Sequence, residues 1–91
     1  MPLVFVGIDP ESEQADSPTA WVDTDRGELL LQGWTATPEE ADRCYAEGGT
    51  APGHAHGVPG HETIIRVPAR MAPVIRKALD ALAQPAPSPD L

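Results

Sequence analysis

Apolar positions cluster in short runs in the first third of the chain and recur at helical spacing only near its end. The first run, Leu3 to Ile8, is apolar at nearly every position. Such a run predicts a strand that is buried on both faces. Asp9 and Pro10 end it, and residues 11–18 form an acidic segment with serine and proline that predicts a loop.

Residues 19–34 predict a β-hairpin around which the rest of the fold is organised. Thr19 to Asp23 contains Thr, Trp and Val, which favour strands. Asp23 to Gly27 predicts the turn, because Asp side chains bond the backbone of turns and Gly supplies a positive φ. The turn lacks an Asn-Gly or Asp-Gly pair, so a loop of about three to five residues is expected. The returning strand is Glu28 to Trp34.

The returning strand carries leucine on both faces. Leu29 and Leu31 alternate with Leu30, which predicts a strand that is central or covered on both sides. Gly33 interrupts the run and indicates a bulge or a close backbone approach. Trp21 and Trp34 are interpreted as core residues, since aromatic side chains contribute much of the buried area; a binding surface is the alternative.

Two helices are predicted in the second half of the chain. Thr37-Pro38-Glu39-Glu40 is typical of a helix start, with Thr37 as N-cap and Glu40 closing a capping box. This helix is short and ends near Gly48. A loop over 48–61 and a strand over Thr63–Val67 follow. The last helix begins between residues 69 and 73 and runs to about residue 83. Its apolar stripe consists of Met71, Val74, Ile75, Ala78, Leu79 and Leu82.

These elements predict an α+β fold in the order β-β-β-α-β-α. We expect a small antiparallel or mixed four-stranded sheet covered by the C-terminal amphipathic helix, because a sheet needs a cover; a partner-docking helix face is the alternative. Residues 1–83 are expected to form one domain with a modest core. Residues 84–91 contain three prolines and are expected to be disordered.

The charge balance narrows the possible partners. Lys and Arg number 6 and Asp and Glu number 14, which gives a net charge of −8. This balance argues against direct binding to nucleic acid, which needs clustered Lys and Arg. It permits a basic protein partner, although an acidic surface that merely keeps the protein soluble is the simpler interpretation. Glu11, Glu13 and Asp16 are the candidate partner-binding residues, and they lack the spacing of an EF-hand calcium loop.

Cysteine content and hydropathy indicate the compartment. Cys44 is the single cysteine, so an internal disulfide is excluded and a cytoplasmic location is expected. The first apolar run lacks a basic segment and is too short for an export signal. No stretch approaches the roughly 18 apolar residues of a membrane span, so no membrane association is expected. Cys44 itself is interpreted as a small buried hydrophobic residue and not as a nucleophile.

The three histidines are the candidate metal ligands. His54, His56 and His61 lie within eight residues, and imidazole suits zinc and nickel. The spacing from Gly48 to His54 and His56 matches the opening of a cupin motif. We reject a cupin because Glu62 follows His56 by six residues instead of four or five, and because no second motif is present. The alternative is a solvated loop whose histidines titrate near neutral pH.

Several segments resemble small uncharacterised acidic proteins of actinobacteria that are often encoded beside helix-turn-helix regulators. The resemblance rests on Val4 to Pro10, Ser17-Pro18-Thr19, Asp23 to Gly27, Gln32-Gly33-Trp34 and Val67 to Met71. It implies a regulatory accessory role and no catalytic residues.

Three hypotheses follow. The first is a non-catalytic protein-interaction module with a protein partner such as a DNA-binding regulator, since no phosphate loop, serine elbow or dinucleotide fingerprint is present. It would use the acidic loop and the exposed edge of the hairpin. The second is a metal-binding protein or metal-dependent enzyme that uses the histidine loop. The third is a homodimer in which open sheet edges pair.

Overall fold

A computed structural model describes residues 3–11 and 17–83 of the chain. The chain divides into two compact units. Unit 1 comprises the described residues up to Gly33 together with those from Val67 onward, and unit 2 comprises Trp34–Arg66. The predicted disordered tail, residues 84–91, lies outside the described residues.

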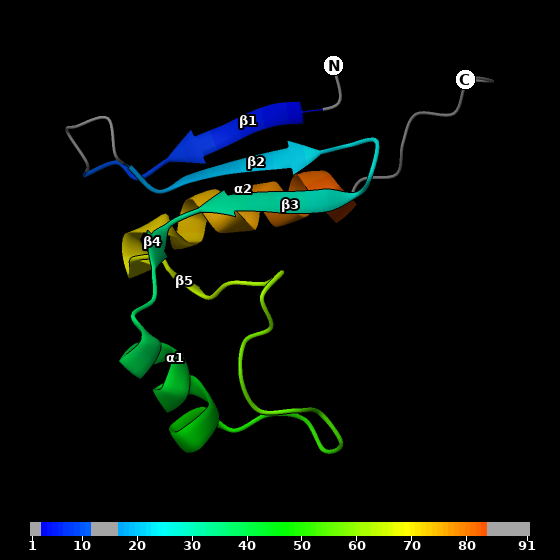
Figure 1. Ribbon diagram of the computed structural model, residues 1–91. Helices are drawn as coiled ribbons and strands as arrows, with labels where there is room; N and C mark the ends of the chain where they lie inside the picture. Colours follow the sequence, from blue (N-terminus) through cyan, green and yellow to red (C-terminus); the bar gives the residue numbers. More distant parts are fainter. Residues whose placement is uncertain (1–2, 12–16, 84–91) are drawn as a thin grey trace. The chain divides into compact units, whose positions relative to one another are not determined.

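Unit 1 contains a three-stranded antiparallel sheet in the order β1-β2-β3. The strands are β1 (Leu3–Ile8), β2 (Thr19–Asp23) and β3 (Glu28–Gln32), and Figure 1 shows them side by side. The predicted hairpin is confirmed, with residues 24–27 as its loop. Oδ1 of Asp23 accepts hydrogen bonds from the backbone N–H groups of Asp25 and Arg26, at 3.1 and 3.0 Å. Gly27 closes the turn with a φ of 65°.

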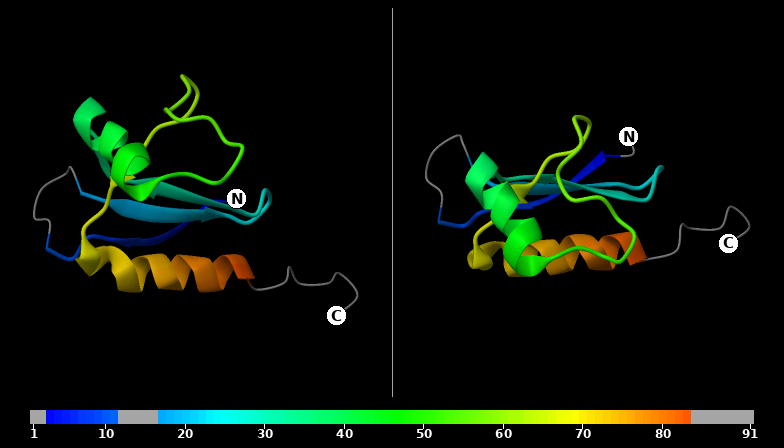
Figure 2. Two further views of the ribbon diagram at one scale, coloured as in Figure 1. Left: turned by 90° about the horizontal axis from the view of Figure 1, so that it is seen from below. Right: turned by 60° about the horizontal axis from the view of Figure 1, so that its bottom comes forward.

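The helix α2 (Ala72–Ala83) follows the 3₁₀ turn η2 (Ala69–Met71) and covers one face of this sheet. Figure 2 shows α2 running along the strands. The predicted C-terminal amphipathic helix is therefore confirmed. Its contact with the sheet forms the core, in which Ala20, Val22 and Ala78 are fully buried. The partly buried side chains packed around these three are Val6, Leu29, Leu31, Val74 and Leu82.

The strand β1 is an edge strand, and the prediction that it is buried on both faces is wrong. Among the described strands it pairs only with β2, and four of its apolar side chains are exposed. The pairing shifts between Phe5 and Gly7, so Val6 is an extra residue that forms a bulge. A Cβ placed on Gly7 would lie 2.9 Å from Cγ1 of Val74, so the backbone of β1 approaches α2 closely at this glycine.

Unit 2 contains a two-stranded antiparallel ladder of β4 (Trp34–Thr35) and β5 (Ile65–Arg66). The single four-stranded sheet that we predicted is therefore replaced by separate sheets of three and two strands. The predicted strand Glu28–Trp34 is divided at Gly33, so Trp34 pairs with Arg66 and not with β2. Only two residues of the predicted strand Thr63–Val67 form the ladder.

Between these strands lies α1 (Pro38–Arg43), which continues into the π-helical turn η1 (Cys44–Gly48). The predicted start at Thr37 is confirmed, and the helical segment ends at Gly48, after which the C-cap residue Gly49 has a φ of 81°. No residue of 34–66 is fully buried, so this unit has little core of its own. Cys44 is exposed, which corrects the prediction that it is buried.

Candidate functional site

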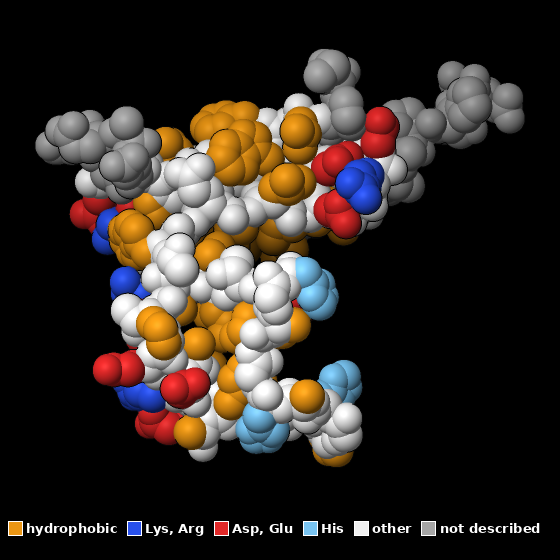
Figure 3. Space-filling model, viewed as in Figure 1, with side chains coloured by type: hydrophobic (Ala, Val, Ile, Leu, Met, Phe, Trp, Pro, Cys, Tyr) orange, Lys and Arg blue, Asp and Glu red, His pale blue; other side chains and the backbone are white. Residues whose placement is uncertain are grey.

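The face of the three-stranded sheet opposite α2, here called the outer face, is apolar across all three strands. Phe5, Trp21 and Leu30 are direct cross-strand partners and form one row. They alternate with Ala20 and Val22, which pack against α2, so the row points away from the helix. Leu3 and Ile8 of β1 flank the row. Figure 3 shows hydrophobic side chains gathered over this part of the sheet.

The outer face is substantially exposed to solvent. The exposed fractions are 59% for Phe5, 52% for Leu3, 46% for Ile8 and 40% for Leu30. Trp21, at the centre of the row, is partly buried. Acidic residues border the patch at one end, where Leu3 pairs with Asp23 and Asp23 pairs with Glu28. A contiguous apolar patch with a polar border is typical of a surface that binds another molecule.

An ion pair between a buried carboxylate and an exposed arginine connects the end of β1 to the start of the helical segment. The side chain of Asp9 is fully buried, and its Oδ1 accepts hydrogen bonds from Nε of Arg70 at 2.6 Å and from the backbone N–H of Glu11 at 3.0 Å. The hydrogen bond to Asp9 raises the pKa of Arg70 above its usual value. This pair fixes the position of two segments and does not present a free reactive group.

The predicted partner-binding residues are only partly described. Glu11 is exposed, and its Oε2 lies 3.5 Å from Nε of Arg70. Glu13 and Asp16 lie outside the described residues. The acidic loop therefore has one described carboxylate, and that carboxylate already faces an arginine.

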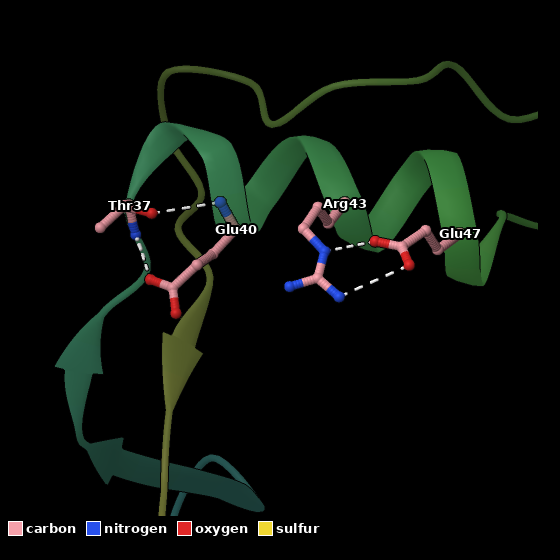
Figure 4. A network of polar contacts seen from close by, with 4 residues as sticks. All are labelled: Thr37, Glu40, Arg43 and Glu47. Atoms are coloured by element: carbon pink, nitrogen blue, oxygen red, sulfur yellow. Dashed lines mark hydrogen bonds and ion pairs between the residues drawn. The ribbon is translucent and has the colours of Figure 1, made fainter.

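In unit 2, the start of α1 is fixed by the predicted capping box, which Figure 4 shows. The backbone N–H of Glu40 donates to Oγ1 of Thr37 at 3.1 Å, and the N–H of Thr37 donates to Oε1 of Glu40 at 2.8 Å. The bond from Thr37 is the main cause that lowers the pKa of Glu40 below its usual value of 4.5, with a smaller contribution from Arg66. One turn later Arg43 pairs with Glu47.

An open cleft of about 380 Å³ lies between α1 and β5, and the exposed residue Cys44 is one of those that line it. Two arginines also line it, but Arg43 pairs with Glu47, and Arg66 lies 3.1 Å from Oε2 of Glu40. The Arg66 guanidinium also lies 5.8 Å from the centre of a Trp34 ring. Both arginines that line the cleft therefore have carboxylate partners.

The histidine loop forms an open hollow of about 500 Å³ rather than an assembled ligand set. His54 and His56 line the hollow together with Tyr45 and Glu62. The centres of the Tyr45 and His56 rings are 5.7 Å apart. His61 does not line it. Within residues 3–11 and 17–83, no three His, Cys, Asp or Glu side chains are close enough together to hold a metal ion.

Sequence reasoning missed the outer face because it assigned the apolar residues of β1 and Leu30 of β3 to a buried layer. The outer face could have been predicted by counting the amphipathic helices that are able to cover the sheet. One amphipathic helix can cover one face of a small sheet, so a sheet that is apolar on both faces leaves one face exposed. The residues that this assignment misplaced are Leu3, Phe5, Ile8 and Leu30.

Among the described helices, none combines the length and the apolar character that crossing a bilayer requires. Comparison with known proteins finds no matching family model, no matching curated protein and no matching solved structure.

Proposed function

We propose that this protein acts through contact with another protein and not through catalysis. The outer face carries this proposal, because its apolar row of Phe5, Trp21 and Leu30 has two exposed members, Phe5 and Leu30. Exposed apolar area of this kind favours association with a surface that removes it from water. The sheet is held from behind by α2, so the row is presented in a fixed geometry.

Charge supports a protein partner over a nucleic acid. The net charge of −8 repels phosphate and attracts basic surfaces. A basic DNA-binding regulator is the partner that the resemblance to regulator-associated proteins suggests. Such a partner would meet the acidic border at Asp23 and Glu28 beside the apolar row. The role of the protein would then be that of a regulatory accessory.

The test compares two lysine variants that change the charge equally. Leu30→Lys places a charge in the outer face, whereas Val4→Lys places the same charge on the opposite face, because Val4 pairs with the core residue Val22. Leu30 and Val4 are similarly exposed, at 40% and 47%, so both variants should fold. We expect affinity purification from native cells to lose specific partners with Leu30→Lys and to retain them with Val4→Lys.

Far-UV circular dichroism of both variants checks that the fold is intact. The proposal fails if wild type and Leu30→Lys recover the same proteins in the same amounts. It also fails if a purified wild-type sample converts a substrate at a rate that Leu30→Lys does not alter, since the role would then be catalytic and independent of the outer face.

A further inference from the structure

We propose that the outer face binds the outer face of a second copy of this chain, so that two sheets pack together about a two-fold axis. This inference rests on the proposed role of the outer face as a contact surface. It names a second copy as the occupant of the apolar row and leaves only the acidic border at Asp23 and Glu28 for a basic partner. The two copies would bury the row of Phe5, Trp21 and Leu30 against the same row of the partner copy. The α2 helices would then lie on the two outsides of the pair, since each covers the opposite face of its own sheet.

Self-complementarity favours a second copy as the occupant. A two-fold interface joins a patch to an identical patch, so the patch must suit itself. The outer face meets this condition because its central row is uncharged on all three strands. Its acidic residues, Asp23 and Glu28, lie at one end, and Arg26 lies 3.6 Å from Glu28 and offsets part of that charge. Packing of sheet on sheet through apolar side chains is a common arrangement.

The exposed area is sufficient for a stable pair. The four most exposed apolar side chains of the face are Leu3, Phe5, Ile8 and Leu30. Taking about 200 Å² for each large apolar side chain, their exposed fractions correspond to roughly 400 Å². Apolar atoms form about 60% of a typical interface, so this patch implies about 650 Å² on each copy. The total of about 1,300 Å² falls in the size range of specific interfaces.

The bulge at Val6 distinguishes this arrangement from pairing of strand edges. An antiparallel pair of two β1 edges would place their two-fold axis near the middle of the strand. The register shift between Phe5 and Gly7 is located there and interrupts a regular hydrogen-bond ladder. Packing of faces needs no such ladder. It also accounts for the exposure of Leu30, which lies on β3 at the far side of the sheet from the β1 edge.

Sedimentation velocity of the full chain, at concentrations from about 1 to 200 µM, tests the proposal. In this range the equilibrium between monomer and dimer can be measured for an interface of this size. We expect wild type to sediment as a dimer with twice the 9.6 kDa chain mass at the upper end. Leu30→Lys should weaken dimerisation at least tenfold, and Val4→Lys should change it less than twofold. Higher salt should strengthen the dimer, because two chains of −8 repel each other.

Fluorescence gives a second readout that does not depend on a disruptive variant. In a Trp34→Phe background, the emission of Trp21 should shift to shorter wavelength as concentration rises, because the row becomes buried. A wild-type protein that remains monomeric at the highest concentration overturns the inference. Loss of the dimer in Val4→Lys but not in Leu30→Lys also overturns it, in favour of edge pairing.

These outcomes separate the inference from the proposed function. Suppose that the wild-type protein is monomeric and that the Leu30→Lys variant no longer captures the partners of the wild type. This result would refute the second copy as occupant and leave the contact role of the face intact. Suppose instead that Leu30→Lys weakens the dimer but leaves the captured proteins and their amounts unchanged. This result would support the inference and limit the contact role of the face to self-association.

Discussion

Asp9 and Arg70 are separated by 61 positions in the chain and joined by a 2.6 Å contact between Oδ1 and Nε. The contact attaches the end of β1 to the turn that precedes α2. It therefore connects the first strand of unit 1 to the helix that covers the sheet. Removing a buried carboxylate of this kind leaves its donors without their acceptor, which is costly when the site is shielded from water.

We expect Asp9→Ala to lower the free energy of unfolding by about 1 to 3 kcal/mol. Glu11→Ala is the matched control, because Glu11 is an exposed acidic residue beside the same arginine, and its loss should change stability by less than about 0.5 kcal/mol. Urea unfolding monitored by circular dichroism measures both. Equal effects of the two substitutions would show that the buried pair does not anchor this corner of the fold.

Gly7 and Val74 provide a test of the contact between β1 and α2. A Cβ on Gly7 would lie 2.9 Å from Cγ1 and 3.2 Å from Cγ2 of Val74, so Gly7→Ala forces a displacement. We expect it to destabilise the protein by about 1 to 3 kcal/mol through overpacking. Val74→Ala removes the obstructing methyl groups. The double variant Gly7→Ala/Val74→Ala should therefore be more stable than the sum of the single losses predicts, and strict additivity would contradict the contact.

The lowered pKa of Glu40 predicts a pH dependence for α1. A carboxyl group with a folded-state pKa below its unfolded value stabilises the fold above that unfolded value, near 4.5 here. This contribution is lost as the pH falls through the lowered folded pKa. Hydrogen exchange of α1 amides should thus show protection that decreases below about pH 4.5. In Glu40→Gln, which keeps an oxygen acceptor for the Thr37 N–H, this decrease should be smaller. An unchanged profile in Glu40→Gln would contradict the assignment.

The histidine loop yields a prediction about metal binding. Since no three ligands are assembled among the described residues, binding of zinc or nickel should be weaker than micromolar in calorimetric titrations at neutral pH. His54→Ala, which removes one of the two histidines at the hollow, should change the affinity little. Sub-micromolar binding that His54→Ala abolishes would instead support the metal hypothesis and require the loop to close around the ion.

Local signals in the sequence determined the parts of the fold that we predicted correctly. The turn residues at 23–27 defined the hairpin, and Thr37 with Glu40 defined the start of α1. The apolar stripe from Met71 to Leu82 defined α2 and its contact with the sheet. Each of these features depends on residues that are close in the chain, which is why sequence patterns contain them.

The division of the strands into two sheets depends on pairing between residues that are far apart in the chain. The pattern of apolar and polar residues contains little information about which strands pair. Gly33 was recognised as an interruption, but its effect was larger than a bulge, because Trp34 pairs with Arg66 in a separate ladder. The apolar run of β1 predicted burial on both faces, although α2 covers one face of this sheet and four apolar side chains of β1 are exposed. The candidate surface consists of the apolar residues on the face of the sheet that α2 does not cover.

The pairing of Trp34 with Arg66 has a consequence for variants in which the segment between them is shortened. The chain leaves unit 1 and returns to it through two adjacent antiparallel strands, so the two ends of residues 34–66 lie side by side. A short turn that joins Gly33 to Val67 should therefore spare the three strands and α2.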